Sequence, residues 1–142
     1  MDCCQEKAVL SDVDILKERK VGHIVIEPFN QENLANGSYD VRLGENYYRG
    51  NSSMKILNPW NENQIKKYWR GPYTADEADE TNAEELGLNV GDKFIRIEPG
   101  ELILTHTEEF IGGKDHIITM MKTRSSLMRS CICVCTFTLN LT

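Results

Sequence analysis

The amino-acid sequence predicts an all-β protein with a short helix near its N-terminus. In residues 94–121, short apolar segments are separated by the turn signals Pro99-Gly100 and Gly112-Gly113, a pattern typical of β-sandwiches and β-barrels. Residues 11–22 instead carry the capping and charge signals of a helix. A chain of 142 residues can bury a core of its own, so we predict a single domain over residues 1–142.

The composition narrows the classes of partner. A net charge of −6 argues against nucleic acid as a partner. No run of about eighteen apolar residues is present, so we expect no membrane span. Residues 1–6 lack the basic and then apolar pattern of a secretory signal, which favours a cytoplasmic location.

The predicted helix has clear boundaries. Ser11 is a favourable N-cap, and Asp14 stands three positions later, as in a capping box. Lys17, Arg19 and Lys20 suit the negative end of the helix dipole, and Gly22 suits the position after the helix. We expect this helix to pack against the domain without a chemical role.

Two strands should follow the helix. Residues 23–26 form a largely β-branched run that Pro28 stops. Asn36-Gly37 is the strongest turn signal of the chain, and residues 39–43 then alternate in polarity as a strand does.

Residues 51–91 are predicted to be an insertion within the domain, partly helical and partly loop. Prolines at positions 59 and 72 interrupt the segment, and Ile65, Tyr68 and Trp69 fit one face of a short helix. Its acidic residues should be solvated; they are Asp76, Glu77, Asp79, Glu80, Glu84 and Glu85.

The later part of the chain is predicted to be mostly strands. We expect strands over residues 94–97, 102–106 and 116–121, with turns at Pro99-Gly100 and Gly112-Gly113. A further apolar run contains three alternating cysteines, which would share one strand face and act as small buried hydrophobes; they are Cys131, Cys133 and Cys135. A soft-metal site is the alternative, although zinc sites usually space their cysteines C-x-x-C.

Residues 122–129 hold the strongest candidate for a binding site. Arg124 and Arg129 flank the adjacent hydroxyls of Ser125 and Ser126. A guanidinium presents a fork of donors that matches two phosphate oxygens, and serine hydroxyls can donate to further oxygens. The segment is therefore a candidate clamp for a polyphosphate, while the simpler alternative is a solvated turn with basic ends.

Asp40 is a second candidate, because it lies where a predicted strand begins beside the Asn36-Gly37 turn. A carboxylate there could hold a hydrated Mg²⁺. The alternative is that it bonds only to its own turn.

Several blocks of the sequence, taken in order, resemble the dCTP deaminase branch of the dUTPase-like superfamily. Residues 10–15 are similar to the family's opening motif, and residues 26–44 contain its second block. Residues 99–101 precede a family strand, and residues 124–129 resemble its nucleotide-binding signature. The order and span of these blocks make the match more specific than any single one.

The resemblance implies a β-clip fold, which is a distorted jelly roll, assembled as a homotrimer. It implies hydrolytic deamination of dCTP to dUTP by an enzyme that uses Mg²⁺ with the triphosphate and no zinc. The substrate-binding residues would be Arg124, Ser125, Ser126, Leu127, Met128 and Arg129, with Ser125 and Arg129 also supporting catalysis. Asp40 would lie near the metal and contact it through water.

The histidines do not indicate a zinc deaminase. Such enzymes need H-x-E followed by P-C-x-x-C, and residues 106–108 match only the first half. His23, His106 and His116 are therefore interpreted as ordinary strand residues.

The resemblance stops after Cys135, so the domain is expected to be incomplete at its C-terminus. Family members continue to a strand with the Glu that activates the attacking water, whereas Asn140 stands in a faintly similar context here. Asn cannot act as a general base, and such a base contributes about a hundredfold to ten-thousandfold to a rate. Two alternatives therefore stay open: a dUTP diphosphatase, or a nucleotide-binding or assembly module without catalysis.

Overall fold

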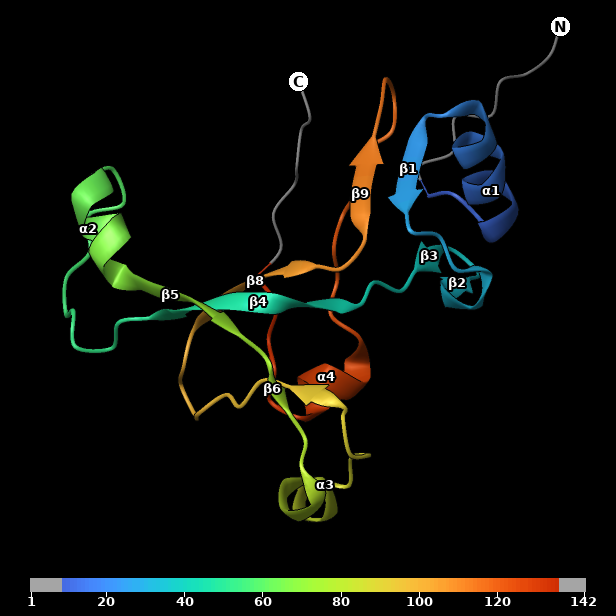
Figure 1. Cartoon of the computed structure of the whole chain (residues 1–142). Helices are drawn as coiled ribbons and strands as arrows, with labels where there is room; N and C mark the ends of the chain where they lie inside the picture. The colour runs from blue at the N-terminus through green and yellow to red at the C-terminus, as the bar shows by residue number, and fades with distance from the viewer. Residues whose placement is uncertain (1–8, 136–142) are drawn as a thin grey trace, which may run out of the picture. The chain divides into compact units, whose positions relative to one another are not determined.

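The computed structural model describes residues 9–135, and Figure 1 shows their helices and strands. The described chain divides into two units, which are residues 9–41 with 109–135, and residues 42–108. Every paired strand is antiparallel, and the helices are short. This confirms the predicted all-β class and is consistent with a dUTPase-like fold. The division into one domain with an insertion at 51–91 stays a prediction.

Helix α1 spans Asp12–Val21, and local sequence explains both of its ends. The backbone N–H of Asp14 donates to the Ser11 hydroxyl at 3.3 Å, and the Asp14 carboxylate accepts from the Ser11 backbone. At the other end, Gly22 adopts a left-handed conformation with φ of 89°, which glycine tolerates without steric cost. The predicted capping box and terminating glycine are confirmed.

The first unit is built on strand β1 (Ile24–Glu27), which pairs with β9 (Phe110–Gly113). Ile15 of α1 packs with Ile24 and Ile26 of β1 to form a small buried core. Figure 1 shows α1 beside β1 and β9 on the other side of that strand. Partly buried side chains surround this core; they include Leu10, Phe29, Leu34, Tyr39, Ile111 and Ile117.

A small hairpin follows β1 in the sequence and belongs to the first unit. A short 3₁₀ segment, η1 (Gln31–Asn33), leads into β2 (Leu34–Ala35), which pairs with β3 (Ser38–Tyr39). The predicted turn at residues 36–37 joins these two strands and is confirmed.

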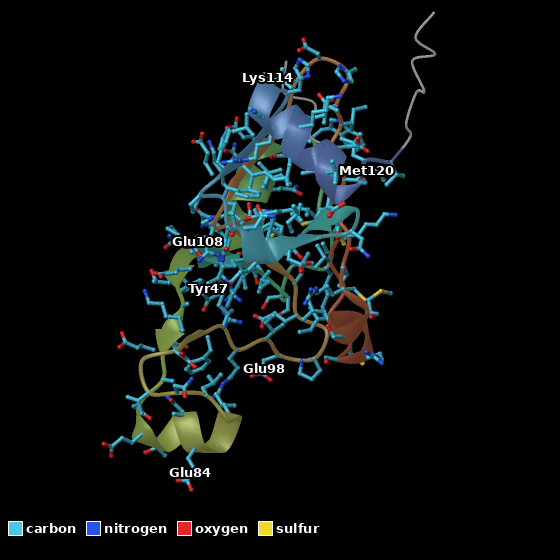
Figure 2. All side chains as sticks on the ribbon, turned by 90° about the vertical axis from the view of Figure 1, so that its right-hand side faces the viewer. Tyr47, Glu84, Glu98, Glu108, Lys114 and Met120 are labelled. Carbon is cyan, nitrogen blue, oxygen red and sulfur yellow. The ribbon has the colours of Figure 1, made fainter. Side chains whose placement is uncertain are left out.

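The second unit is organised around β4 (Leu43–Gly50), which lies between β5 (Trp69–Thr74) and β8 (Ile103–Thr107). Gly44 lies directly against His106, because a Cβ atom at this position would lie 2.2 Å from the ring, so a larger residue would require that exposed side chain to move. Tyr47 of β4 is buried at 5% exposure and is labelled in Figure 2.

The remaining elements of the second unit are short. Helix α2 (Glu62–Tyr68) is capped by Asn61 and leads into β5. Helix α3 (Glu80–Leu86) is capped by Asp79 and lies between β6 (Asp76–Glu77) and β7 (Lys93–Phe94), which pair with each other. The predicted helix is confirmed for Ile65 and Tyr68, whereas Trp69 begins β5. The acidic residues of 76–85 are exposed as expected.

Several predicted strand boundaries are wrong. The strand expected at 39–43 is split, because β3 ends at Tyr39 and β4 begins only at Leu43. The segment 94–97 contributes a strand only at its start. Gly112 and Gly113 lie within β9 rather than in a turn, because they pair with Val25 and Ile24 of β1. The backbone also approaches Gly113 closely, since a Cβ atom there would lie 2.5 Å from the Ile117 oxygen.

The C-terminal predictions also need correction. Residues 116–121 form a turn and irregular chain with a single bridge residue, and residues 131–134 form no strand. Cys131, Cys133 and Cys135 are free and exposed, so the prediction that they are buried is wrong. Residues 1–8 and 136–142, including Asn140, lie outside the described residues. Within residues 9–135, no helix combines the length and apolar character needed to cross a membrane.

Candidate functional site

The Arg-Ser segment forms a single helical turn, α4 (Ser125–Arg129), in the first unit. Arg124 is its N-cap, with extended backbone angles of φ −63° and ψ 144°. The sequence predicted a turn rather than a helix. A helix this short positions residues 124 and 129 at its two ends, so their side chains leave the backbone about one and a half turns apart.

Hydrogen bonds around α4 hold its shape. The Ser130 hydroxyl donates to the Ser126 carbonyl at 3.1 Å, and the backbone N–H of Ile132 donates to the Leu127 carbonyl at 3.0 Å. After the helix, the backbone N–H of Val134 donates to the Thr123 hydroxyl at 3.3 Å. The segments before and after α4 are thereby tied together.

Arg124 binds Asp40 through two parallel hydrogen bonds. Its Nε donates to Oδ1 at 3.1 Å, and its Nη2 donates to Oδ2. Asp40 follows β3, and its backbone N–H donates to the Asn33 carbonyl at 2.8 Å, which fixes its position. The pair joins two predicted site residues that are 84 positions apart in the sequence.

This ion pair is open to solvent. The Arg124 side chain is 68% exposed and the Asp40 side chain 37%. Pairs with this exposure contribute about 0–1 kcal/mol, because water screens the charges and ordering two side chains costs entropy. A more highly charged anion can therefore compete for the Arg124 guanidinium.

The other predicted binding residues are on the surface of α4. Ser125, Ser126, Leu127, Met128 and Arg129 are all exposed. Among the described residues, the Arg129 guanidinium has no carboxylate partner, so its charge can act on a ligand.

Asp40 fits the donor chemistry of Mg²⁺ in part. Mg²⁺ is usually bound by one or two carboxylates together with waters and substrate phosphates. Asp40 supplies one such carboxylate, although both of its oxygens accept from Arg124 in the structure. No second carboxylate was predicted for this position.

The H-x-E residues do not act as metal ligands together. The His106 ring contacts its neighbouring backbone, with Nδ1 2.8 Å from the Thr107 carbonyl oxygen. Glu108 lies 3.3 Å from Nη1 of Arg42. Among the described residues, the one group of three side chains that could hold a metal is elsewhere, at Glu18, His23 and His116.

Sequence analysis missed a second arginine–carboxylate pair, in the other unit. Arg49 of β4 binds Glu101, and its Nη2 donates to the Arg96 carbonyl at 2.8 Å. The hydrogen bond from Arg49 lowers the pKa of the Glu101 carboxyl, and the same bond raises the pKa of Arg49. The only available signal was the turn ending at Glu101, which gives no information about its partner.

Comparisons with known proteins agree with the resemblance. A sequence profile of the family described as dCTP deaminase-like matches residues 9–140. A dCTP deaminase of Haloarcula marismortui is 30% identical over 129 residues, which cover 89% of this chain and 58% of that protein. A dCTP deaminase of Aeropyrum pernix is 29% identical over 86% of this chain and 58% of its own length.

Some relatives carry a more specific name. A protein of Methanosphaera stadtmanae named "dCTP deaminase, dUMP-forming" is 32% identical over 86% of this chain and 55% of its own length. The chain thus spans little more than half the length of these relatives.

Proposed function

Because this chain belongs to the dCTP deaminase-like family, we propose that it binds the triphosphate of dCTP and serves its hydrolytic deamination to dUTP. The observation that carries the proposal is the exposed, two-bond contact between Arg124 and Asp40 at the start of α4. It shows the guanidinium already presenting its fork to an oxyanion.

Binding of the triphosphate would exchange one oxyanion for another. Two phosphate oxygens can take the place of the Asp40 carboxylate on Arg124, because a triphosphate carries more charge than a single carboxylate. Arg129, which has no carboxylate partner among the described residues, would contact a second phosphate group. The hydroxyls of Ser125 and Ser126 are exposed and can donate to the remaining oxygens.

Asp40 would be the residue that holds Mg²⁺ through a water molecule. When bound, the ion neutralises part of the phosphate charge. The exchange on Arg124 would release the Asp40 carboxylate for this role. The deamination itself is proposed to need no zinc.

The reaction replaces the amino group of cytosine by oxygen. Water adds to C4 of the ring, a base takes a proton from that water, and ammonia leaves after its nitrogen is protonated. Asn140, which sequence analysis compared with the family's water-activating Glu, lies outside the described residues. The proposed contributions of Arg124, Ser125, Ser126 and Arg129 are binding and orientation.

The clamp is tested by comparing triphosphate with nucleoside. Arg124→Ala should weaken binding of Mg-dCTP by at least about tenfold, since it removes charge-assisted hydrogen bonds worth about 1.5–3 kcal/mol. Binding of deoxycytidine should not change. Lys122→Ala is the matched control, because it removes a nearby positive charge and leaves the Arg124 guanidinium in place. Equal losses for both ligands would contradict the clamp.

Two other functions have specific support. Conversion of dCTP to dUMP, as in the name of one relative, requires release of both ammonia and pyrophosphate. A nucleotide-binding module without catalysis is the other alternative, since Arg124 and Arg129 could hold a triphosphate without a catalytic base. Incubation with dCTP and with dUTP separately distinguishes the three functions. A dCTP deaminase releases ammonia alone from dCTP, and a dUMP-forming enzyme releases both ammonia and pyrophosphate from it. A binding module binds the nucleotides and releases neither product.

We also propose a cytoplasmic homotrimer. The described residues bury few apolar side chains and expose many, including Leu102 just before β8, Leu104 within β8 and Leu127 of α4. Apolar surface of this kind is often covered in an oligomer. The exposed thiols of Cys131, Cys133 and Cys135 suit a reducing compartment. Light scattering coupled to gel filtration would measure the mass, and a monomer would contradict the trimer.

A further inference from the structure

Three side chains with metal-binding atoms meet in the first unit. Glu18 lies in the last turn of α1, His23 immediately precedes β1, and His116 lies in the turn after β9. Oε2 of Glu18 is 2.7 Å from Nδ1 of His23 and 3.9 Å from Nε2 of His116. We propose that these three residues bind a divalent transition-metal ion of the Zn²⁺ class.

The distances suit a small tetrahedral ion. One ligand atom from each residue lies within 4.8 Å of the other two. Zinc bonds of about 2.0–2.2 Å place tetrahedral ligand atoms about 3.4 Å apart, so small side-chain rotations would complete the site. Two imidazoles and one carboxylate match zinc, with water as the fourth ligand, whereas Mg²⁺ and Ca²⁺ prefer oxygen ligands.

The backbone holds these ligands together. The His23 N–H donates to the Glu18 carbonyl at 3.0 Å as part of the helix ending at Gly22. The His23 carbonyl in turn accepts from the Lys114 N–H at 2.8 Å, which ties the turn after β9 to the start of β1. Figure 2 shows Lys114 beside α1. Residues distant in sequence are thereby fixed near one another before any metal binds.

The turn that carries His116 is closed in an unusual conformation. The Ile117 N–H donates to the Lys114 carbonyl at 3.0 Å, and Asp115 has a φ of 56°. A left-handed conformation is uncommon for a residue other than glycine. Asp is one of the few residues besides glycine that adopt it readily, so the turn fixes the position of His116 without large strain.

Asp115 also has a suitable place next to His23. Its Oδ2 lies 3.6 Å from Nε2 of His23, the ring nitrogen opposite the one that faces Glu18. A carboxylate on the outer nitrogen of a metal-binding histidine fixes the tautomer and the ring orientation. The His23 and His116 rings meet edge to face, with centroids 5.1 Å apart. Asp115 is therefore a positioning residue and not a ligand.

The site is separate from the proposed nucleotide clamp, because the two share no residue. Bound metal would connect α1, β1 and the turn after β9, and so stabilise the first unit by an amount that grows with the logarithm of the metal concentration once the site is mostly filled. The proposal of zinc-independent deamination is unaffected, and either proposal can fail without the other. The His116 side chain is 65% exposed, which gives the ion access from solvent.

Calorimetric titration with Zn²⁺ tests the site in the absence of nucleotide. The full chain should carry Ser at its five cysteine positions, so that thiolates cannot bind the metal. We expect one zinc per chain. His116→Asn should lower the affinity by at least about tenfold, and Asp115→Asn by about tenfold with unchanged stoichiometry. His106→Asn is the matched control and should bind zinc as the parent does.

Two results would overturn the proposal. One is the absence of zinc binding by a chain whose β1 and β9 amides are protected from hydrogen exchange, which shows that the unit is folded. The other is unchanged affinity in both His116→Asn and Glu18→Gln. His116 is exposed, so its replacement should leave the fold intact, and the same exchange measurement checks this.

Discussion

The two arginine–carboxylate pairs of this protein use the same chemistry in different surroundings. Arg49 and Glu101 have side chains that are only 23% and 16% exposed, whereas Arg124 and Asp40 are 68% and 37% exposed. Arg49 also donates to the Arg96 carbonyl and, at 3.3 Å, to the Tyr47 hydroxyl. Arg124 binds the Asp40 carboxylate but, among the described residues, no backbone carbonyl.

The difference separates a structural ion pair from an exchangeable one. The Arg49 guanidinium is held by a carboxylate, a carbonyl and a hydroxyl, and it lies 5.1 Å from the centroid of the Tyr47 ring. A ligand would have to replace several contacts at once to displace it. The Arg124 guanidinium loses only an exposed carboxylate, which contributes about 0–1 kcal/mol. Exposure and the number of partners therefore indicate which arginine can bind substrate.

The largest expected effect comes from breaking the less exposed pair, Arg49 and Glu101. Glu101→Gln should lower the free energy of unfolding by about 2–3 kcal/mol, because it leaves the partly buried Arg49 cation without its charged partner. Both tryptophans, Trp60 and Trp69, lie in residues 42–108, so tryptophan fluorescence during urea unfolding reports on the second unit.

Glu98→Gln is the matched control for this measurement, because it changes an exposed Glu in the same turn. It should alter the free energy of unfolding by less than about 0.5 kcal/mol. If the two variants lose the same stability, the Arg49–Glu101 pair is no more important than a surface contact.

The second prediction uses pH. The hydrogen bond from Arg49 holds the pKa of Glu101 below its ordinary value of 4.5. A lowered pKa means that the stabilising charge is fully present above about pH 4.5 and is lost as the pH falls through the folded-state value. Wild type should therefore exceed Glu101→Gln in stability at pH 7, and this difference should shrink in acid below pH 4.5.

Urea midpoints measured by tryptophan fluorescence at neutral pH and at two acidic pH values test this. If the stability difference between wild type and Glu101→Gln stays constant down to the lowest pH, the packing of the Glu101 side chain, and not its charge, causes that difference. Asp40→Asn is the control, since it changes a carboxylate in the other unit and should leave this pH dependence unaltered.

Sequence analysis succeeded where structure is decided by near neighbours. Ser11, Asp14 and Gly22 determine the ends of α1 through contacts within a few residues, and all three were predicted. Asn36-Gly37 likewise joins adjacent strands. It failed where distant segments decide: Gly113 resembles a turn residue, but it lies in β9 because it pairs with Ile24 of β1.

In the candidate site, too, the sequence indicates the individual residues but not the contacts between distant ones. Arg124 and Asp40 were each selected by residue type and by resemblance, but nothing in the sequence indicated that they bind each other across 84 positions. The Glu18, His23 and His116 cluster was missed because each residue has an ordinary local setting. The cysteines were misjudged because the alternating pattern assumed a strand, whereas Cys131 has a φ of 60° and no strand forms.

The smallest expected effect on stability comes from breaking the exposed pair. Asp40→Asn should change the stability of the first unit by less than about 1 kcal/mol, because both side chains are well solvated. Hydrogen exchange of the β1 and β9 amides measures this without relying on tryptophan, which the first unit lacks. A loss as large as that of Glu101→Gln would mean that Arg124 is also held structurally.

The same variant should have a clear effect on binding. Removing Asp40 frees Arg124 from its internal competitor, so metal-free dCTP should bind up to about fivefold more tightly, which corresponds to an ion pair worth about 1 kcal/mol. The gain in affinity that Mg²⁺ gives to wild type should at the same time be reduced, because the proposed carboxylate for the ion is gone. Titrations with and without Mg²⁺ separate the two effects. Weaker binding of metal-free dCTP by Asp40→Asn would show that Asp40 orients Arg124 for the phosphate instead of competing with it.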